Sequence, residues 1–122
     1  MINKYKTSLP GAGENIKKNN INNEVLPTIK GIALEHGCAY VIPDDRILIR
    51  VLKKSKEEKM NLVEDFGIIS YNDTLLKEFV EGGITTISTD FNKMGEQLAH
   101  MIINNETKKL VNPNKLTIRK SL

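Results

Sequence analysis

Polar side chains follow two apolar segments of this chain, at the point where each segment ends. Phe66–Tyr71 is a nearly continuous apolar run, typical of a strand buried on both faces, and Asn72–Thr74 come directly after it. Asp44 follows the shorter run Ala39–Ile42 in a similar way. Ligands of open α/β sheets bind at the carboxyl ends of the strands. Carboxylate, amide and hydroxyl groups there can exchange hydrogen bonds with a small polar ligand such as a sugar.

Helix capping is the alternative role for these corner residues. An aspartate at a helix N-terminus accepts an orphan backbone N–H and favours the positive end of the helix dipole, which stabilises by roughly 1 kcal/mol. Capping is the interpretation that we favour for Asp45 and Asp73. For Asp44 and Asn72 the residues alone leave both interpretations open.

Apolar runs and helical periodicities alternate along the chain from residue 39 onward. The expected strands are 39–42, 66–71, 84–88 and 116–119, and the expected helices are 45–59, 74–80 and 90–104. This alternation predicts an α/β fold, with a parallel sheet flanked by helices. The first 38 residues have a weaker pattern. They suggest an irregular start over 1–13, short helices at 14–20 and 29–36, and an Asn-rich turn between these helices.

The composition is that of an ordinary globular chain and restricts the function. A length of 122 residues indicates one domain, with 39% apolar and 27% charged residues. No apolar run approaches the ~20 residues of a membrane-spanning helix, and the amino terminus lacks the apolar core of a signal peptide. We therefore expect a cytoplasmic protein without a membrane partner. The single Cys38 cannot form an internal disulfide and is expected to be buried filler. The net charge of +3 comes from dispersed lysines, which favours a solvated surface over a nucleic-acid patch.

Enzymatic function has little support in the sequence. His36 and His100 are far apart, and no recognisable nucleophile motif surrounds a serine or Cys38. Asp44, Asp73 and Asp90 could converge as catalytic or metal-binding carboxylates, but helix capping explains each of them more simply. We expect no enzyme activity, no cofactor and no metal ion.

Several short motifs resemble one family in their order and spacing. They are Ile42–Asp45, Tyr71–Thr74, Ile84–Ile87, Asp90-Phe91 with Met94-Gly95, and Leu116–Ser121. Together they resemble the sensor domain of the LacI/GalR transcriptional regulators, which has a type I periplasmic-binding-protein-like fold. The resemblance covers residues 39–122, the carboxyl-terminal part of that domain. Residues 1–38 form a poorly matched leading segment.

The resemblance implies a two-lobed sugar sensor in a dimeric repressor. Residues 39–83 would lie in the carboxyl-terminal lobe, Thr85–Thr89 would cross between the lobes, and helix 90–104 would belong to the other lobe. The family reads operator DNA through an amino-terminal helix-turn-helix, and this chain starts too late to contain one. We expect contact with operator DNA only through such a domain. The alternatives are a sugar-binding protein of the periplasmic type and a small α/β enzyme domain.

The resemblance also assigns roles to individual residues. By position, Asp44 and Asn72 match residues that hydrogen-bond the hydroxyls of the effector. Thr89 and Phe91 match a polar contact and an aromatic wall at the crossing, although Phe91 could equally be the first core residue of its helix. Helix 45–59 has apolar residues nearly all round, so part of its surface needs another partner. The implied dimer contacts are Ile49, Leu52, Phe79 and Val80.

Overall fold

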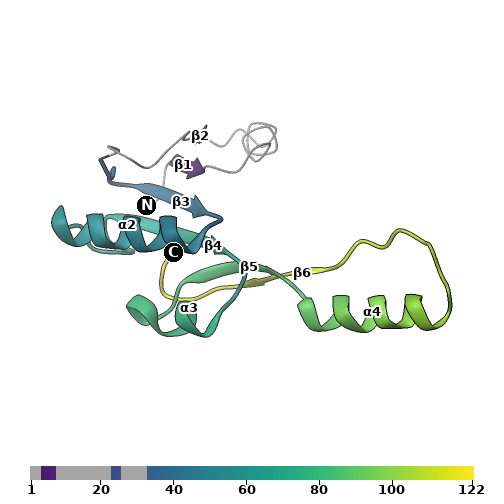
Figure 1. The fold of residues 1–122 in the computed structure, drawn as a ribbon. Coiled ribbons are helices and arrows are strands. Elements are labelled where there is room, and N and C mark those ends of the chain that lie inside the picture. Colours follow the sequence, from purple (N-terminus) through teal and green to yellow (C-terminus); the bar gives the residue numbers. More distant parts are fainter. Residues whose placement is uncertain (1–3, 8–22, 26–32) are drawn as a thin grey trace.

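The computed structural model describes residues 4–7, 23–25 and 33–122, which form a sheet-based body and a projecting helical arm (Figure 1). The strands of this part of the chain form one sheet in the order β2-β1-β3-β4-β5-β6. They are β1 (Lys4–Thr7), β2 (Asn23–Val25), β3 (Cys38–Ile42), β4 (Phe66–Tyr71), β5 (Thr85–Thr89) and β6 (Asn114–Thr117). The helices are α2 (Asp45–Glu57), α3 (Leu75–Phe79), the 3-10 turn η1 (Val80–Gly82) and α4 (Phe91–Ile103).

The sheet confirms the expected α/β fold and adds one antiparallel edge. All pairings from β2 through β5 are parallel, as the alternation of strands and helices predicts. β6 runs antiparallel to β5, with Thr89 opposite Asn114, because the chain reverses after α4 and returns along the edge of the sheet. The last strand therefore occupies Asn114–Thr117 and not the expected residues 116–119.

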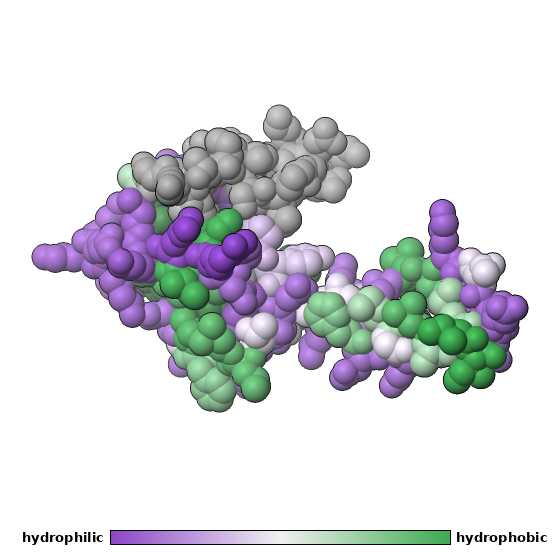
Figure 2. Space-filling model, viewed as in Figure 1, coloured by the Kyte–Doolittle hydropathy of each residue, from purple (hydrophilic) through white to green (hydrophobic). Residues whose placement is uncertain are grey.

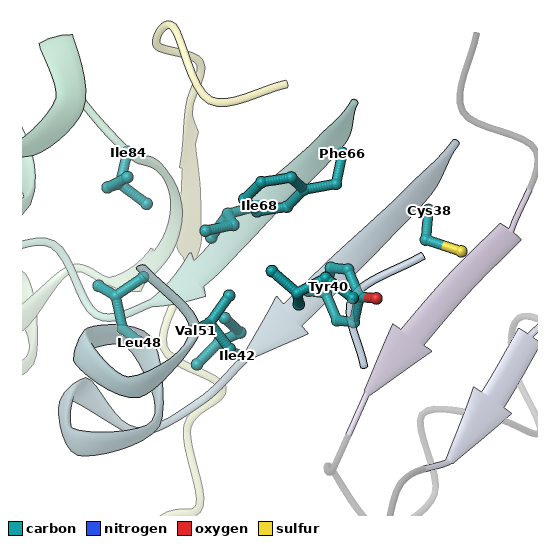
Figure 3. Close-up of a cluster of buried hydrophobic side chains, with 9 residues drawn as sticks. Cys38, Tyr40, Ile42, Leu48, Val51, Phe66, Ile68 and Ile84 are labelled. Atoms are coloured by element: carbon teal, nitrogen blue, oxygen red, sulfur yellow. The ribbon is translucent and has the colours of Figure 1, made fainter. Parts of the chain in front are cut away.

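The core lies between α2 and the two central strands of the body. Alternate residues of β3 and β4 point to the same face, so Tyr40, Phe66 and Ile68 lie together and meet Leu48 and Val51 of the helix (Figure 3). The rings of Tyr40 and Phe66 meet edge to face with centroids 6.0 Å apart. Burial of such side chains stabilises by about 1.5–3 kcal/mol each. This core fixes the position of the carboxyl ends of β3 and β4. Cys38 is buried in the same cluster, as expected of filler.

The leading segment contributes two strands that the sequence did not predict. Residues 4–7, expected to be irregular, form β1 and pair with β3, and residues 23–25, expected to be a turn, form β2. Neither segment alternates clearly between apolar and polar residues, so backbone pairing and not side-chain pattern determines them. The expected helix at 14–20 and the first half of the one at 29–36 lie outside the described residues, and residues 33–36 are not helical.

Two glycines end the α3 region with backbone conformations that favour glycine. Gly82 and Gly83 have φ values of +78° and +109°. A Cβ atom on Gly83 would lie 2.8 Å from Cδ of Arg119, so this turn also needs the absence of a side chain. The glycine break expected after the helix is therefore required by both conformation and space.

The segment after β6 fills a gap between β4 and β5. The ladder between these strands pairs only Ile69–Tyr71 with Thr85–Ile87. Ser121 is fully buried beside it: its hydroxyl donates to the Ile68 carbonyl at 2.7 Å and accepts the Thr85 N–H at 2.7 Å. The Ser121 carbonyl also accepts the Ile68 N–H, at 2.7 Å. Ser121 thus extends the contact between β4 and β5.

The arm formed by α4 and its following loop projects away from the body (Figure 1). Asp90 caps the helix by accepting the Lys93 N–H at 2.9 Å, which agrees with the expected start. None of its thirteen residues is buried. No helix in the described part of the chain has the length and apolar character that crossing a membrane requires.

Candidate functional site

The carboxyl edge of the sheet brings the two predicted hydroxyl-binding residues to neighbouring strand ends. Ile42 pairs with Ser70 in the β3–β4 ladder. Asp44 and Asn72 each follow their strand partner by two residues, so they lie on adjacent turns at the same edge. This is the position at which open α/β sheets hold ligands.

Asp44 serves as the N-cap of α2 and also pairs with an arginine. Its Oδ1 accepts the Arg46 N–H at 2.8 Å, and the Arg46 side chain donates to both carboxylate oxygens, from Nε at 3.2 Å and from Nη2 at 3.0 Å. The hydrogen bonds from Arg46 lower the pKa of Asp44 from 3.8 to about 2. Asp44 is therefore a stable anion that only accepts hydrogen bonds, and its partly exposed oxygens retain capacity for ligand hydroxyls.

Asn72 occupies an unusual conformation and holds an unsatisfied oxygen. Its φ of +57° is in the left-handed region, which asparagine tolerates better than most residues. Its backbone N–H donates to the Ile87 carbonyl at 2.9 Å. Its side-chain Oδ1 is buried and has no hydrogen-bond partner within the described residues. Such atoms are uncommon in native proteins, and an ordered water or a ligand can supply the partner.

Asp45 and Asp73 form ion pairs and do not cap helices, in contrast to the sequence-based expectation. The caps are Asp44 and Thr74. Asp45 Oδ1 lies 2.7 Å from Nζ of Lys77. Asp73 accepts two hydrogen bonds from the Arg119 guanidinium, at 2.7 and 2.9 Å, and this contact lowers the pKa of Asp73. Cap position within a corner is set by backbone angles, which the sequence pattern does not specify to one residue.

Lys77 and Arg119 are the two cations at this corner that sequence reasoning missed. Lys77 lies between Leu76 and Glu78 in a short helical stretch, and the sequence pattern gave it no role. Arg119 is remote in sequence and reaches Asp73 because the segment after β6 returns beside β5. The acidic residue that could have indicated Lys77 is Asp45 at the neighbouring corner, whereas Asp73 pairs with Arg119.

Thr89 and Phe91 lie where β5 ends and the arm begins. Thr89 Oγ1 donates to Asn114 Oδ1 across the β5–β6 pair at 3.3 Å. Phe91 is the first residue of α4 and is half exposed, so it is not a core residue of the described structure. Because β5 neighbours β4, Thr89 ends at the same edge as Asn72. The aromatic ring of Phe91 is available to a ligand or to another part of a larger protein.

The residues expected in a dimer contact differ in exposure. Ile49 is 56% exposed and Phe79 is 77% exposed, whereas Leu52 and Val80 are partly buried. Leu52 packs against the core cluster, so it contributes at most an edge to an interface. Figure 2 shows apolar side chains gathered on the body around α3, where Phe79 is joined by the exposed Leu75 and Leu76.

A hollow of about 290 Å³ lies at the opposite end of α2. Its lining includes Leu52, Met60 and the ion pair between Lys56 and Glu81, whose Nζ and Oε1 atoms are 2.9 Å apart. This hollow is remote from the carboxyl edge and does not include the predicted ligand residues. Among the residues that the structure describes, no group of three or more His, Cys, Asp or Glu side chains is placed to hold a metal ion.

Comparison with known proteins identifies the family. The sequence profile of the periplasmic binding protein-like domain matches residues 3–122. The lac repressor dimer bound to operator and the anti-inducer ONPF is 16% identical, with a TM-score of 0.73, over 98% of this chain and 45% of that one. A LacI-family repressor from Corynebacterium glutamicum is 20% identical, with a TM-score of 0.68, over 98% of this chain and 57% of that one.

A LacI-family regulator from Bifidobacterium animalis subsp. lactis is 18% identical, with a TM-score of 0.72, over 98% of this chain and 55% of that one. This chain thus spans about half the length of these structures, and at such identities the likeness is one of fold. A comparison with curated protein sequences gives no match. The resemblance of the motifs to LacI-type sensor domains is confirmed at the level of the fold. The chain belongs to the family of periplasmic binding protein-like domains.

Proposed function

We propose that this chain is the effector-sensing part of a LacI/GalR-type transcriptional repressor and that its effector is a sugar. The family match and the repressors of the same fold support a ligand-sensing regulatory domain. One observation carries the choice of site: the buried Oδ1 of Asn72 has no hydrogen-bond partner within the described residues and lies at the strand end next to that of Asp44. A ligand hydroxyl would satisfy this oxygen.

The proposed ligand contacts are Asp44, Asn72, Thr89 and Phe91. Asp44 and Asn72 supply acceptor oxygens at adjacent strand ends, and Thr89 adds a hydroxyl at the end of β5. The half-exposed ring of Phe91 offers an apolar face of the kind that packs against the C–H groups of a sugar. Acceptors beside a flat apolar surface suit a sugar better than an anionic or a wholly apolar ligand.

The proposed mechanism is a shift between two arrangements of the sensor. A sugar bound between two lobes changes their relative angle, and this change alters the spacing of two DNA-reading heads. Operator DNA is contacted only through an amino-terminal domain outside these residues. The chain itself carries no specific DNA-binding surface in this proposal, works in the cytoplasm and acts by binding and not by catalysis.

We also propose that the complete regulator is a homodimer that uses Ile49, Leu52, Phe79 and Val80. The exposure of Ile49 and Phe79 supports this surface. Phe79→Glu is expected to weaken dimerisation measured by analytical ultracentrifugation, because it buries a charge in an apolar contact. Val63→Glu, a change at a half-exposed apolar site in the loop before β4, is the control. A strictly monomeric wild-type chain at high micromolar concentration would contradict the proposal.

Sugar binding is tested first by thermal stability. A panel of mono- and disaccharides is added to the chain, and a ligand present at about 100 times its dissociation constant stabilises by about 2.7 kcal/mol. The expected result is a rise in the midpoint temperature of thermal unfolding with one or a few related sugars. The absence of any shift across the panel would remove the sugar from the proposal.

Substitutions at the two strand ends then locate the site. Asn72→Ala and Asp44→Ala are each expected to cost roughly 1–3 kcal/mol of sugar affinity, because the ligand hydroxyls lose their partners. Two further variants separate binding from folding: Asn72→Gly keeps the left-handed backbone available, and Asp44→Ser keeps a capping oxygen. If all four variants bind the sugar as tightly as the wild type, these residues have only a structural role.

A further inference from the structure

The short helix α3 has an inverted pattern of burial. Its apolar residues are largely exposed, with Leu75 and Phe79 each at 77%, whereas Lys77 between them is 1% exposed. A charged side chain is seldom buried without partners, because removal of an ammonium group from water is costly. The inversion therefore implies that contacts of the Lys77 ammonium inside the body offset the cost of its desolvation.

The ammonium group of Lys77 uses all three of its donors. Nζ lies 2.5 Å from the Tyr71 carbonyl, 2.8 Å from the Asn72 carbonyl and 2.7 Å from Oδ1 of Asp45. A lysine ammonium has three N–H donors and no acceptor, so this set satisfies it completely. Hydrogen bonds from a charged donor are stronger than neutral ones, and partial burial strengthens them further.

Two of these acceptors fix the backbone of Asn72. The left-handed φ of +57° at Asn72 brings two successive carbonyls, those of Tyr71 and Asn72, to the same ammonium. The N–H of Asn72 is held on the other side by the Ile87 carbonyl at 2.9 Å. Asn72 is thus restrained through both its donor and its acceptor, and the direction of its side chain follows from that restraint.

The third acceptor connects the neighbouring strand end. Asp45 is the first residue of α2 and directly follows Asp44, the other proposed hydroxyl acceptor. By contacting Asp45 and Asn72 together, Lys77 joins the turn after β3 to the turn after β4. Beyond the end of the β3–β4 ladder, the position of Asp44 relative to Asn72 is therefore restrained by a side chain that contacts neither of their functional groups.

We propose that Lys77 is the positioning residue of the effector site, holding Asn72 in its left-handed conformation and in register with Asp44. The link to effector binding rests on the proposed function, whereas the effect on Asn72 is a property of the unliganded protein. Lys77 itself is not a ligand-contacting residue: its donors are occupied, and its side chain is buried.

The test compares amide hydrogen exchange in the unliganded chain and in two variants. Lys77→Met removes the ammonium and keeps the length of the side chain, whereas Val51→Ala weakens the core at a site remote from the corner. The two amides of interest are those of Asn72, bonded to the Ile87 carbonyl, and Ile68, bonded to the Ser121 carbonyl. In Lys77→Met we expect exchange at Asn72 to rise about 100-fold more than at Ile68, because the opening is local. In Val51→Ala the exchange rates of the two amides should rise by the same factor.

A weaker variant and a chemical rescue distinguish a local effect of Lys77 from a general loss of stability. Asp45→Asn weakens only one of the three contacts, at an exposed carboxylate, and should raise exchange at Asn72 by a smaller factor without affecting Ile68. In a Cys38→Ala background, Lys77→Cys alkylated with bromoethylamine in urea restores an ammonium at nearly the same length. Refolded alkylated protein should recover the slow exchange at Asn72, which an apolar side chain of similar volume would not restore. Equal changes at Asn72 and Ile68 in Lys77→Met and Asp45→Asn, or no recovery on alkylation, would overturn the proposal.

Sugar-binding measurements on the same variants separate this inference from the proposed function. For any sugar that stabilises the wild-type chain, Lys77→Met should lower affinity about 10-fold or more, and Val51→Ala less than about 2-fold. If no sugar binds the wild type, the proposed sugar function fails, and the exchange measurements still decide the role of Lys77. If a sugar binds the wild type and Lys77→Met with equal affinity, the positioning role fails while the sensing function remains.

Discussion

The helices α2 and α4 are alike in sequence design and opposite in environment. Each has thirteen residues, and each begins after an aspartate whose side chain accepts a backbone N–H. α2 buries Leu48, Val51 and Ser55 against the sheet, whereas α4 buries none of its residues. Ile102 and Ile103, near the end of α4, are 79% and 82% exposed. Figure 2 shows the resulting apolar surface along the arm.

The comparison shows that an amphipathic pattern predicts which face of a helix is apolar but does not predict what covers that face. Both helices carry apolar residues at helical spacing, and capping supports both starts. Only α2 has a sheet within reach. Each apolar side chain left exposed forgoes about 1.5–3 kcal/mol of burial. The arm is therefore expected to contribute little to the stability of the described body and to favour self-association.

The largest expected effect distinguishes leucines on the two helices. Leu48→Ala on α2 should lower the free energy of unfolding by about 2–5 kcal/mol, because it leaves a cavity in the core. Leu98→Ala on α4 should lower it by less than about 0.5 kcal/mol, because the side chain is already half exposed. Urea denaturation followed by circular dichroism measures both. Equal losses would show that α4 is packed in solution.

Hydrogen exchange provides the next contrast. The amides of residues 94–102 in α4 should exchange through local opening, faster than those of Phe66–Tyr71 in the centre of the sheet. The measurement uses a dilute sample, so that association does not protect the arm. Protection of residues 94–102 equal to that of β4 in a monomer would refute the contrast.

Charges on the arm should reduce association without a loss of stability. Ile102→Glu combined with Ile103→Glu should shift the chain toward monomer in sedimentation experiments and change the unfolding free energy by less than about 0.5 kcal/mol. Ile42→Glu, placed in the buried core, serves as the opposite case and should prevent folding. A double variant on the arm that unfolds the protein would contradict the proposed independence of α4.

The smallest effect concerns the start of α2 and depends on pH. The pKa of Asp44 is lowered to about 2 in the folded protein by its hydrogen bonds with Arg46. A lowered folded-state pKa gives a contribution that is present above pH 3.8 and is lost as the pH falls through about 2. Urea midpoints at pH 5 and at pH 2 should therefore differ less in Asp44→Asn than in the wild type. An unchanged difference would show that the Asp44–Arg46 contact does not form in solution.

Sequence reasoning succeeded where one pattern dominated and failed where several segments combine. The run Phe66–Tyr71 was predicted to be β4 with the same bounds, because a strand buried on both faces has a continuous apolar signal. β1 was missed because its stability comes from pairing with β3, to which no local pattern points. The strand ends at Asp44 and Asn72 were correctly located at one edge, and their ligand role stays a prediction.

Lys77 shows the physical limit of pattern-based inference at the site. Hydropathy favours burial of Leu75 and Leu76 and exposure of the lysine, whereas the two leucines are 77% and 52% exposed and Lys77 is 1% exposed. Its burial depends on three oxygens from three positions in the chain, Asp45, Tyr71 and Asn72, and this coincidence exists only in the folded state. Left-handed backbone at Asn72 is likewise a product of the turn and not of the residue type alone.

The burial of Ser121 between β4 and β5 has a consequence for the order in which the chain folds. β4 and β5 can pair as soon as both strands have formed, but the Ile68 and Thr85 amides reach their partner only when the segment after β6 docks beside them. Closure of this contact joins residues 53 positions apart in sequence, and such non-local contacts form late. Until then the strands have an incompletely paired interior edge, which can bind another nascent chain. Refolding of Ser121→Ala from urea should therefore give more misassembled protein than refolding of the wild type under the same conditions.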